Sequence, residues 1–481
     1  MNWQILLEII YYIILLGFTF KVIYDTDSST KAAAYILFIF LLPIVGIIIY
    51  LSFGLNYRKS QIYDKKLVLD KDQKRTINQL IDVYLKDTKK EFGEKYAQYY
   101  GLVNMLFSDV DSFVTKNNKV KLLLNGEEKF PAMFDAIRNA KHHIHIEYYI
   151  YDNDDIGNQL AEILMQKARE GVEVRFIYDD FGSRKIRKNL VPKMRASGVE
   201  AYTFYKVNFI YLANRLNYRN HRKIVIIDGC VGFVGGINVS DKYINKSQEN
   251  LYWRDTHLML EGETVNELQR IFLADWNFCA GQNIKPNTLF FKEHPVLETP
   301  QWVQIIPSGP DSINPSILYS LLYAITIAKN EILITTPYLI PGEELLHALH
   351  MAVLRGVKVK ILVPEVSDSR IVNAVSKSYY LELLKQGVEI YLYQKGFVHA
   401  KTMVCDDDLS IVGTANLDNR SFDLNFEVNA LVYDQGITRK LREAFNNDLK
   451  ASRQIHYNEW VTRKKYKQFL EKCFRLISPL M

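Results

Sequence analysis

Apolar residues are concentrated at the start of the chain, in two runs that cover residues 4–24 and 32–57. The second run has no charged residue between Ala32 and Tyr57, and it exceeds the roughly 20 residues that cross a bilayer as a helix. The first run carries Glu8 and Lys21 near its ends, where long side chains can reach the membrane interface. The pattern predicts two transmembrane helices within residues 1–57.

The charges that flank these runs predict an orientation. The short connection holds Asp25, Asp27 and Lys31, whereas seven Lys and Arg residues follow the second run between positions 58 and 75. By the positive-inside rule, the rest of the chain is expected on the cytoplasmic side of the cell membrane. A cleaved signal peptide is the alternative, but residues 1–4 lack a basic region and a further apolar run follows. Pro43 is compatible with a membrane helix when neighbouring groups satisfy the freed carbonyl.

After residue 117 the pattern changes to short β-branched strands that alternate with amphipathic helices, and the same order occurs twice. In the first copy we expect strands at Val120–Leu124, His143–Ile150 and Gly171–Phe176, with helices at Phe130–Asn139 and Leu160–Glu170. In the second copy we expect strands at Val303–Ile306, Ile332–Thr336 and Gly356–Ile361, with helices at Ile317–Ala328 and Leu345–Leu354. Strands that alternate with helices predict an α/β protein built from two similar lobes.

The domain organisation follows from these patterns. We expect transmembrane helices in residues 1–57, a charged helical connector in 58–117, a first lobe in 118–285, and a linker in 286–300. A second lobe is expected in 301–455 and an amphipathic tail in 456–481. In the connector, residues 79–84 have apolar helical spacing. In the tail, apolar residues at helical spacing lie opposite several lysines, which suits either an interfacial helix or docking on the folded body.

Composition narrows the function classes. The chain has 481 residues, 48% of them hydrophobic, which is enough for a large core and excludes general disorder. Four cysteines without a C-x-x-C pair exclude a disulfide framework and a cysteine zinc site. A net charge of +6 does not indicate nucleic-acid binding, and it is compatible with an anionic substrate or a membrane surface.

The closest correspondence between the two copies is a polar motif with the spacing H-x-K-x4-D. The first copy contains His221, Lys223 and Asp228, and the second contains His399, Lys401 and Asp406. A Gly and an Asn follow each His at offsets of 14 and 17 residues, namely Gly235 with Asn238 and Gly413 with Asn416. A single copy could arise by chance or form a solvated strand face, but two copies at matching offsets favour an active site.

Strand alternation places His221 and Lys223 on one face, so that a nucleophile or base and a cation share a pocket. Asp228 lies an odd number of residues from Lys223 in a favoured Asp-Gly turn, so we expect Asp228 and Asp406 to be mainly structural members of the catalytic motifs. The Gly and Asn residues are expected to approach a substrate phosphate. Two imidazoles, two ammonium groups and two amides suit a phosphodiester: one His attacks phosphorus, the other protonates the leaving oxygen, and the lysines neutralise charge.

Each catalytic His also needs a partner that fixes its tautomer. Glu427 is the candidate in the second half, and Asp255 is the candidate in the first half, with Glu249 as its rival in a polar loop. Two histidine-rich segments, His142–His145 and His347–His350, lack ligands at metal-site spacing, so we assign no metal. No nucleotide-binding fingerprint is present, and we expect no cofactor.

These motifs resemble those of the phospholipase D superfamily, in which two H-x-K-x4-D halves form one active site. More narrowly, the chain is similar to bacterial cardiolipin synthases. This closer resemblance rests on the paired N-terminal runs and on five segments: Asn217–Asn220, Gly235–Asn238, Trp253–His257, Thr336–Tyr338 and Gly413–Phe422. The resemblance covers nearly the whole chain.

The resemblance implies that a phosphatidyl group passes from one phosphatidylglycerol to another, giving cardiolipin and glycerol. It implies that His221 forms the phosphohistidine and that His399 acts first as acid and then as base, although the near symmetry of the halves leaves this order open. The expected partners are phosphatidylglycerol and membrane lipids, with no nucleic acid. The alternatives are a membrane-bound phospholipase D or other phosphodiesterase that uses water, and a non-catalytic lipid-binding scaffold.

Overall fold

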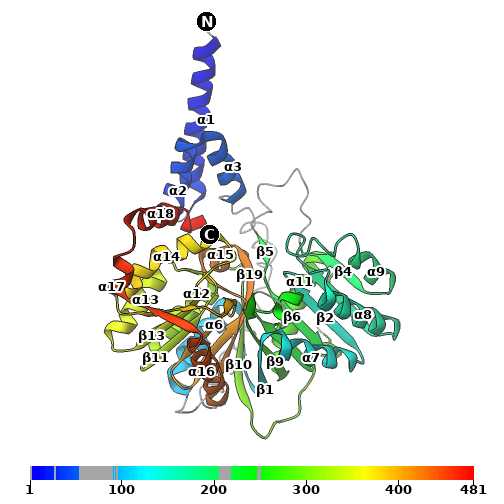
Figure 1. The fold of residues 1–481 in the computed structure, drawn as a ribbon. Coiled ribbons are helices and arrows are strands. Elements are labelled where there is room, and N and C mark those ends of the chain that lie inside the picture. The colour runs from blue at the N-terminus through cyan, green and yellow to red at the C-terminus, as the bar shows by residue number, and fades with distance from the viewer. Residues whose placement is uncertain are drawn as a thin grey trace.

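The computed structural model describes residues 3–26, 29–53, 96–204, 218–245, 251–285 and 287–480, together with positions 90 and 93. An N-terminal group of apolar helices stands above a large α/β body (Figure 1). The α/β class and the internal repeat are therefore confirmed. The predicted helix at residues 79–84 and the candidate Glu249 lie outside the described residues.

The N-terminal helices differ from the predicted pair of spans. Helix α1 (Trp3–Asp25) has 23 residues and is, among the described residues, the one helix long and apolar enough to cross a membrane. The second apolar run forms two shorter helices, α2 (Ser29–Leu41) and α3 (Pro43–Phe53). The break falls at Pro43 because proline lacks the N–H that a continuous helix needs and its ring clashes with the preceding turn. Helices α2 and α3 pack on each other and on α1 through buried Leu15, Val22, Tyr35, Ile39 and Tyr50.

The body is organised around one mixed sheet of 16 strands, within the part of the chain that the structure describes. The first lobe contributes β1 (Val114–Leu124), β2 (His143–Tyr148), β3 (Glu173–Tyr178), β4 (Glu200–Thr203), β6 (Lys223–Ile227), β7 (Val231–Gly235) and β9 (Thr256–Gly262). The second contributes β10 (Gln301–Ser308), β11 (Glu331–Thr335), β13 (Lys358–Pro364), β14 (Glu389–Tyr393), β16 (Thr402–Cys405), β17 (Leu409–Gly413), β19 (Asn425–Tyr433) and β20 (Ser452–Ile455).

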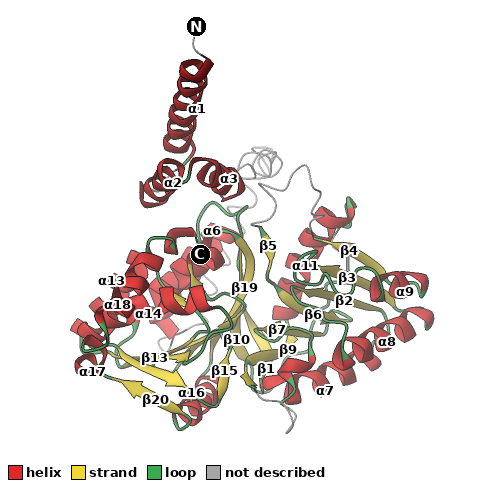
Figure 2. Ribbon diagram, turned by 45° about the horizontal axis from the view of Figure 1, so that its top comes forward, coloured by secondary structure: helices red, strands yellow, loops and turns green. Residues whose placement is uncertain are grey.

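The strand order shows that the two lobes are copies joined at the centre. From the middle outward the first lobe runs β1-β9-β7-β6-β2-β3-β4, and the second runs β10-β19-β17-β16-β11-β13-β14-β20. The lobes meet where β1 pairs antiparallel with β10, so they share one continuous sheet. Figures 1 and 2 show the strands of both lobes converging on this central pair. Strand β1 begins at Val114, a few residues before the expected lobe boundary.

Helices cover both faces of the sheet and divide its core into three parts. In the first lobe, α7 (Asn125–Arg138), α8 (Asp155–Arg169) and α9 (Leu190–Ala196) cover one face. In the second, α12 (Ser316–Ile327), α13 (Glu343–Leu354) and α14 (Arg370–Lys385) do so. Helices α11 (Thr264–Ala280) and α16 (Gln435–Leu449) cover the other face, where residues of both lobes form one core.

The end of the expected connector belongs to this packing. Its described part forms η1 (Ala97–Tyr99) and α6 (Tyr100–Val110), and their apolar residues join the core of the second lobe. Helix α6 contacts α12 and β10. The chain thus reaches the second lobe before it enters the first, which ties the two lobes together.

Candidate active site

The His and Lys of each motif lie at the start of a strand, β6 or β16, and the opposite lobe holds the backbone that leads into the motif. The short strand β5 (Arg219–Asn220) pairs with β19, and β15 (Gly396–Val398) pairs with β8 (Tyr252–Arg254). The next residue in each case is the motif His. The His221 N–H donates to the carbonyl of Phe426 at 2.9 Å, and the His399 N–H donates to the carbonyl of Arg254 at 2.7 Å. Both histidines are therefore fixed at the junction of the lobes.

The two imidazoles are oriented by buried carboxylates of the opposite lobe. His221 Nδ1 lies 2.9 Å from both carboxylate oxygens of Glu427, and His399 Nδ1 lies 2.7 Å from Asp255 Oδ2. The structure places both expected carboxylates beside the motif histidines, but each contacts the His of the opposite half, so the pairing expected within each half is wrong. Because each His is held against the other lobe, the nearest carboxylate comes from that lobe. With Nδ1–H donating to a carboxylate, each Nε2 is left with a free lone pair.

The structure brings the two histidines together in one cavity of about 490 Å³. Strand ends and loops of both lobes line it. The lining residues are Tyr149, Ile150, Arg219, His221, Asn238, Lys242, Tyr243, Trp253, Tyr338, Ile340, Asp368, Val372, His399, Asn416, Asp418, Arg420 and Asn425. Both histidines therefore face one cavity between the lobes, as a reaction that uses two histidines on one substrate requires.

The motif lysines lie behind the histidines. Lys223 Nζ donates to the His221 carbonyl at 2.6 Å, while Lys401 Nζ donates to the His399 carbonyl and lies 3.1 Å from His399 Nδ1. Neither lysine is among the described residues that line the cavity. Burial lowers the pKa of Lys223 to about 7 and that of Lys401 to about 8, against the attraction of Glu427 and Asp255. In this structure the lysines act on the cavity through their charge.

Burial also controls the charge of the two imidazoles. It lowers the pKa of His221 to about 4, although Glu427 opposes the shift. Burial and the charges of nearby Lys401 and Lys242 lower the pKa of His399 well below its ordinary value. Both rings are therefore neutral near pH 7 without a ligand, which leaves their Nε2 atoms able to act as nucleophile or base.

The two carboxylates differ in a way that distinguishes the halves. Burial alone would raise the pKa of Glu427, but His221 and Lys223 bring it below the ordinary value, and Thr414 adds to this. Thr414 Oγ1 donates to Glu427 Oε2 at 2.5 Å, and Asn425 Nδ2 donates to Oε1 at 3.1 Å.

Asp255, in contrast, accepts the Thr256 N–H at 2.7 Å in addition to His399. Burial raises the pKa of Asp255 to about 6, against the opposing charge of Lys401. Gly236 stands where the second lobe has Thr414, and a Cβ there would lie 2.2 Å from Asp255 Oδ1. Glu427 is thus held as an anion, whereas Asp255 lies close to a protonation threshold.

The motif aspartates have a structural role, as their spacing predicted. Asp228 and Asp406 have positive φ angles of 54° and 50°. The Asp228 carboxylate accepts the backbone N–H groups of residues 141, 142 and 143 at 2.7–2.9 Å. Asp406 does the same for residues 329, 330 and 331 at 2.7–3.0 Å. They lie at the far ends of β6 and β16 and do not line the cavity, so their inclusion among the catalytic candidates is corrected.

The candidate phosphate-binding residues divide into two kinds. Asn238 and Asn416 line the cavity. Asn238 is occupied by the Ile150 N–H and the Tyr243 hydroxyl, whereas the Asn416 Oδ1 is buried without a hydrogen-bond partner among the described residues.

The glycines do not line the cavity, and the expected phosphate contact at these positions is not supported. A Cβ at Gly235 would lie 2.6 Å from the His257 Cα, and one at Gly413 would lie 2.6 Å from the Val428 carbonyl oxygen. These glycines allow close backbone approach between β7 and β9 and between β17 and β19. Their physical role is strand packing, because a side chain would collide with the neighbouring backbone.

Several residues that line the cavity were not predicted from the sequence. Arg219, Lys242 and Arg420 bring positive charge to the lining, and aromatic rings surround the histidines. The Tyr149 ring lies 4.9 Å from that of His221, and the Trp253 ring lies 5.6 Å from that of His399, centroid to centroid. A signal for Arg219 was available, because it precedes His221 by two residues and strand alternation places both on one face. The cavity combines cations with neutral imidazoles, which suits an anionic phosphodiester.

The lining carboxylates are engaged in the protein. Asp368 accepts the Tyr338 hydroxyl, and Asp418 caps α15 (Asn419–Asp423) through the Ser421 N–H at 2.7 Å. Among the residues that the structure describes, no group of three His, Cys, Asp or Glu side chains is arranged to hold a metal ion. His143 and His145 lie buried, with their rings about 5 Å from that of Phe290.

Comparisons with known proteins identify relatives of this chain. A family profile described as "Cardiolipin synthase, PLD-like domain" matches residues 133–276 and 321–449, and a "Phospholipase_D-nuclease N-terminal" profile matches residues 10–54. The chain is 40% identical to cardiolipin synthase 2 of Bacillus anthracis, covering 95% of this chain and 88% of the relative. It is also 40% identical to the cardiolipin synthase of Alkalihalophilus pseudofirmus, covering 96% and 91%.

A solved structure shows the same fold at low sequence identity. The crystal structure of the phosphatidylserine synthase of Haemophilus influenzae superposes with a TM-score of 0.58 at 15% identity, covering 75% of this chain and 95% of that one. The two-lobed architecture is therefore shared with a protein of different sequence.

Proposed function

Since this chain belongs to the cardiolipin synthase family of PLD-like enzymes, we propose that the shared cavity performs its phosphatidyl transfer through a histidine-linked intermediate. The enzyme is a phosphatidyltransferase that joins two phosphatidylglycerol molecules into cardiolipin and releases glycerol. One phosphodiester replaces another, so the reaction needs no external energy source. The observation that carries the proposal is that two imidazoles, each held at Nδ1 by a buried carboxylate, line one cavity.

In the first step, His221 Nε2 attacks the phosphorus of one phosphatidylglycerol. The new P–N bond replaces the P–O bond to the terminal glycerol, and His399 donates a proton to the departing oxygen. His399 is neutral in the free site, but an anionic phosphodiester in the cavity favours its protonated form. Arg219, Lys242 and Arg420 line the cavity and neutralise the charge that develops on the phosphoryl oxygens.

In the second step, His399 takes a proton from the terminal hydroxyl of a second phosphatidylglycerol. That oxygen attacks phosphorus, the P–N bond breaks, and His221 returns to its neutral state. The product is cardiolipin, and both histidines end in their starting form.

The difference between the two carboxylates supports this division of roles. Phosphorylation makes the His221 ring cationic, and an anionic Glu427 held by Thr414 and Asn425 stabilises that cation. Asp255, with a pKa of about 6, suits a His that gains and loses a proton in turn. The sequence halves are nearly symmetric, whereas Thr414 and Gly236 make the site asymmetric.

The N-terminal region supports a membrane location for this chemistry. We propose that α1 crosses the membrane and that the body lies on the cytoplasmic side, because the basic residues follow the apolar runs. Helices α2 and α3, each about 20 Å long or less, pack beside the half of α1 that is nearer the body. A cavity that receives lipid from the bilayer limits the access of water, which competes for the same intermediate.

The test is product analysis with purified enzyme in phosphatidylglycerol bilayers. Wild-type enzyme should give cardiolipin and glycerol in equal amounts, and His221→Ala and His399→Ala should each abolish both products. His347→Ala, an exposed histidine on α13, is the matched control and should retain full activity. Phosphatidic acid as the sole lipid product would instead assign a hydrolase, and activity in both cavity variants would assign a non-catalytic role to the cavity.

The assignment of the nucleophile has its own measurement. Rapid quenching of the wild-type enzyme with labelled phosphatidylglycerol, followed by peptide mass spectrometry, should locate the phosphatidyl adduct on His221. An adduct on any other residue would overturn the assignment.

A further inference from the structure

The C-terminal helix α18 (Lys465–Arg475) is strongly two-sided, and its orientation is the reverse of that in an ordinary surface helix. Residues 468, 471 and 475 share one helical face, and residues 466, 469, 470 and 473 share the opposite one. The first face is polar and carries Gln468, Glu471 and Arg475. The second is apolar and carries Tyr466, Phe469, Leu470 and Cys473, with Phe474 at its edge.

The polar face is attached to the body. The Gln468 amide donates to the carbonyls of Val461 and Arg463 at 3.1 and 2.7 Å. Glu471 forms two 2.8 Å contacts with the Arg463 guanidinium, and Arg475 pairs with Glu382 of α14 at 3.0 Å. These polar groups therefore hold the helix against residues 461–463 and against α14.

The apolar face is left uncovered. Tyr466 is 58% exposed, Phe469 67%, Leu470 51% and Phe474 37%, and α18 contributes no buried residue to the fold. A helix that only docked on the body would turn these side chains inward, because burying them is favourable and burying charged groups is costly. The orientation predicts an apolar environment on the outer side.

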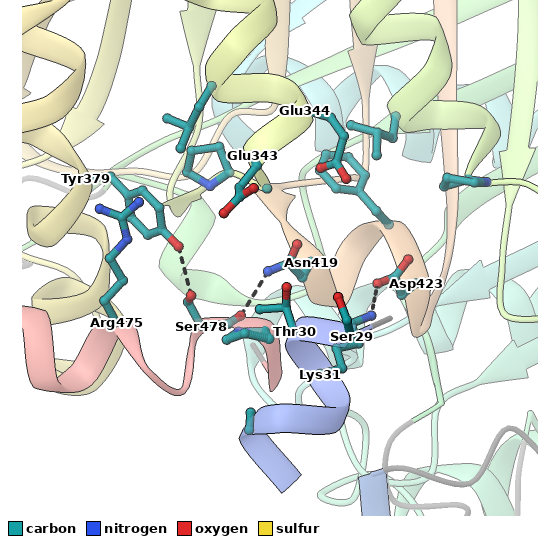
Figure 3. Close-up of a pocket in the computed structure, with 18 of the residues that line it drawn as sticks. Ser29, Thr30, Lys31, Glu343, Glu344, Tyr379, Asn419, Asp423, Arg475 and Ser478 are labelled. Atoms are coloured by element: carbon teal, nitrogen blue, oxygen red, sulfur yellow. Dashed lines mark hydrogen bonds and ion pairs between the residues drawn. The ribbon is translucent and has the colours of Figure 1, made fainter. Parts of the chain in front are cut away.

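The place of α18 in the molecule identifies that environment. The chain after α18 ends in η4 (Ser478–Leu480), which contacts α2. The Ser478 hydroxyl accepts a hydrogen bond from the Tyr379 hydroxyl at 2.8 Å, and the Ser478 carbonyl accepts one from the Asn419 amide at 2.9 Å. Lys31 of α2 forms an ion pair with Asp423 (Figure 3). These residues line a cavity of about 910 Å³ between α2 and the body, and Figure 3 labels them. Figure 1 shows α18 at the end of the body from which the N-terminal helices rise.

The charged residues of α18 fit an anionic lipid surface. Helical spacing places Lys465 and Lys472 at one border of the apolar face and Lys467 at the other, and all three are exposed. Lysines at such borders can reach phosphate groups while the apolar residues enter the acyl boundary.

We propose that α18 is a second membrane attachment, which lies in the interface of an anionic phospholipid bilayer with Phe469 and Leu470 inserted. The body is then held to the membrane at two points, α1 at the N-terminal end and α18 at the C-terminal end. This proposal does not depend on which histidine is the nucleophile.

The test uses two native exposed cysteines in the full-length protein. Cys473 lies on the outer face of α18, and Cys230 lies in the β6–β7 turn beside Asp228, at the end of β6 away from the cavity. A variant with Cys230→Ser and Cys279→Ser leaves Cys473 as the exposed cysteine for an environment-sensitive dye, and Cys405, which stays in both variants, is buried. The matched control, Cys473→Ser with Cys279→Ser, leaves Cys230. Both are placed in nanodiscs of phosphatidylglycerol and phosphatidylcholine.

In these nanodiscs the Cys473 dye should show blue-shifted emission and be quenched by nitroxide-labelled lipids, while the Cys230 dye should be quenched by aqueous iodide. Nanodiscs of phosphatidylcholine alone should weaken the lipid quenching of the Cys473 dye. Equal iodide quenching at both positions would overturn the proposal. Protection of Cys473 from both quenchers, with cross-linking between chains at that position, would also overturn it and assign the face to a second copy of the protein.

Discussion

Replacing Glu427 by Gln removes a buried negative charge and leaves the size of the side chain nearly unchanged. Both carboxylate oxygens lie 2.9 Å from His221 Nδ1, and Thr414 and Asn425 hold them from other directions. The surrounding packing should therefore survive while the charge opposite His221 is lost.

The expected effect can be estimated from this distance. Attack on phosphorus converts the neutral His221 ring into a cation. At 2.9 Å and an effective dielectric constant of about 20, one unit charge stabilises that cation by about 6 kcal/mol. Since about 1.4 kcal/mol corresponds to a tenfold change in rate, kcat should fall by about 10⁴-fold. The new amide can also donate to Nδ1, which favours the wrong tautomer and acts in the same direction.

The assay is cardiolipin formation by purified enzyme in phosphatidylglycerol bilayers, followed by mass spectrometry. Thr414→Val is the matched control, because it removes one hydrogen bond to the Glu427 carboxylate but keeps the charge of that carboxylate. It should lower kcat about tenfold. Thermal unfolding in detergent verifies that both variants are folded. If Glu427→Gln unfolds like the wild type and loses no more activity than Thr414→Val, the electrostatic explanation is refuted.

Three further predictions follow from the same geometry. The value of kcat/KM should fall below about pH 6, where Asp255 gains a proton, and above about pH 7, where Lys223 loses one. A flat profile of kcat/KM from about pH 5 to about pH 9 would contradict these pKa shifts. Asp228→Ala should lower the free energy of unfolding by about 3 kcal/mol, because three N–H groups lose their acceptor and alanine must adopt a positive φ. Denaturant unfolding measures that loss of stability. A purely structural role would be refuted if Asp228→Ala were as stable as the wild type, or if the folded Asp228→Ala protein had a much reduced kcat. Gly236→Ala should displace Asp255 from His399 and lower turnover with little change in melting temperature, and normal turnover would show that the carboxylate can move without consequence.

The sequence alone determined the local elements and the chemistry they carry. Strand β2 begins at the predicted His143 and ends within the predicted range, and α12 lies within one residue of the predicted helix at each end. These predictions succeed because strand alternation and helical spacing are local properties of the chain. The duplicated motif also identified both histidines, since the repeat placed them at equivalent positions in two copies of one lobe.

The tertiary structure decided which groups meet. His221 is oriented by Glu427, which lies 206 positions away in the other lobe, and no local pattern reports such a contact. The pairing arises because β1 joins β10 and each lobe adds a short strand to its neighbour. The outward apolar face of α18 was likewise decided by packing. A local pattern states which face of an element is apolar, whereas the arrangement of all the elements determines what that face contacts.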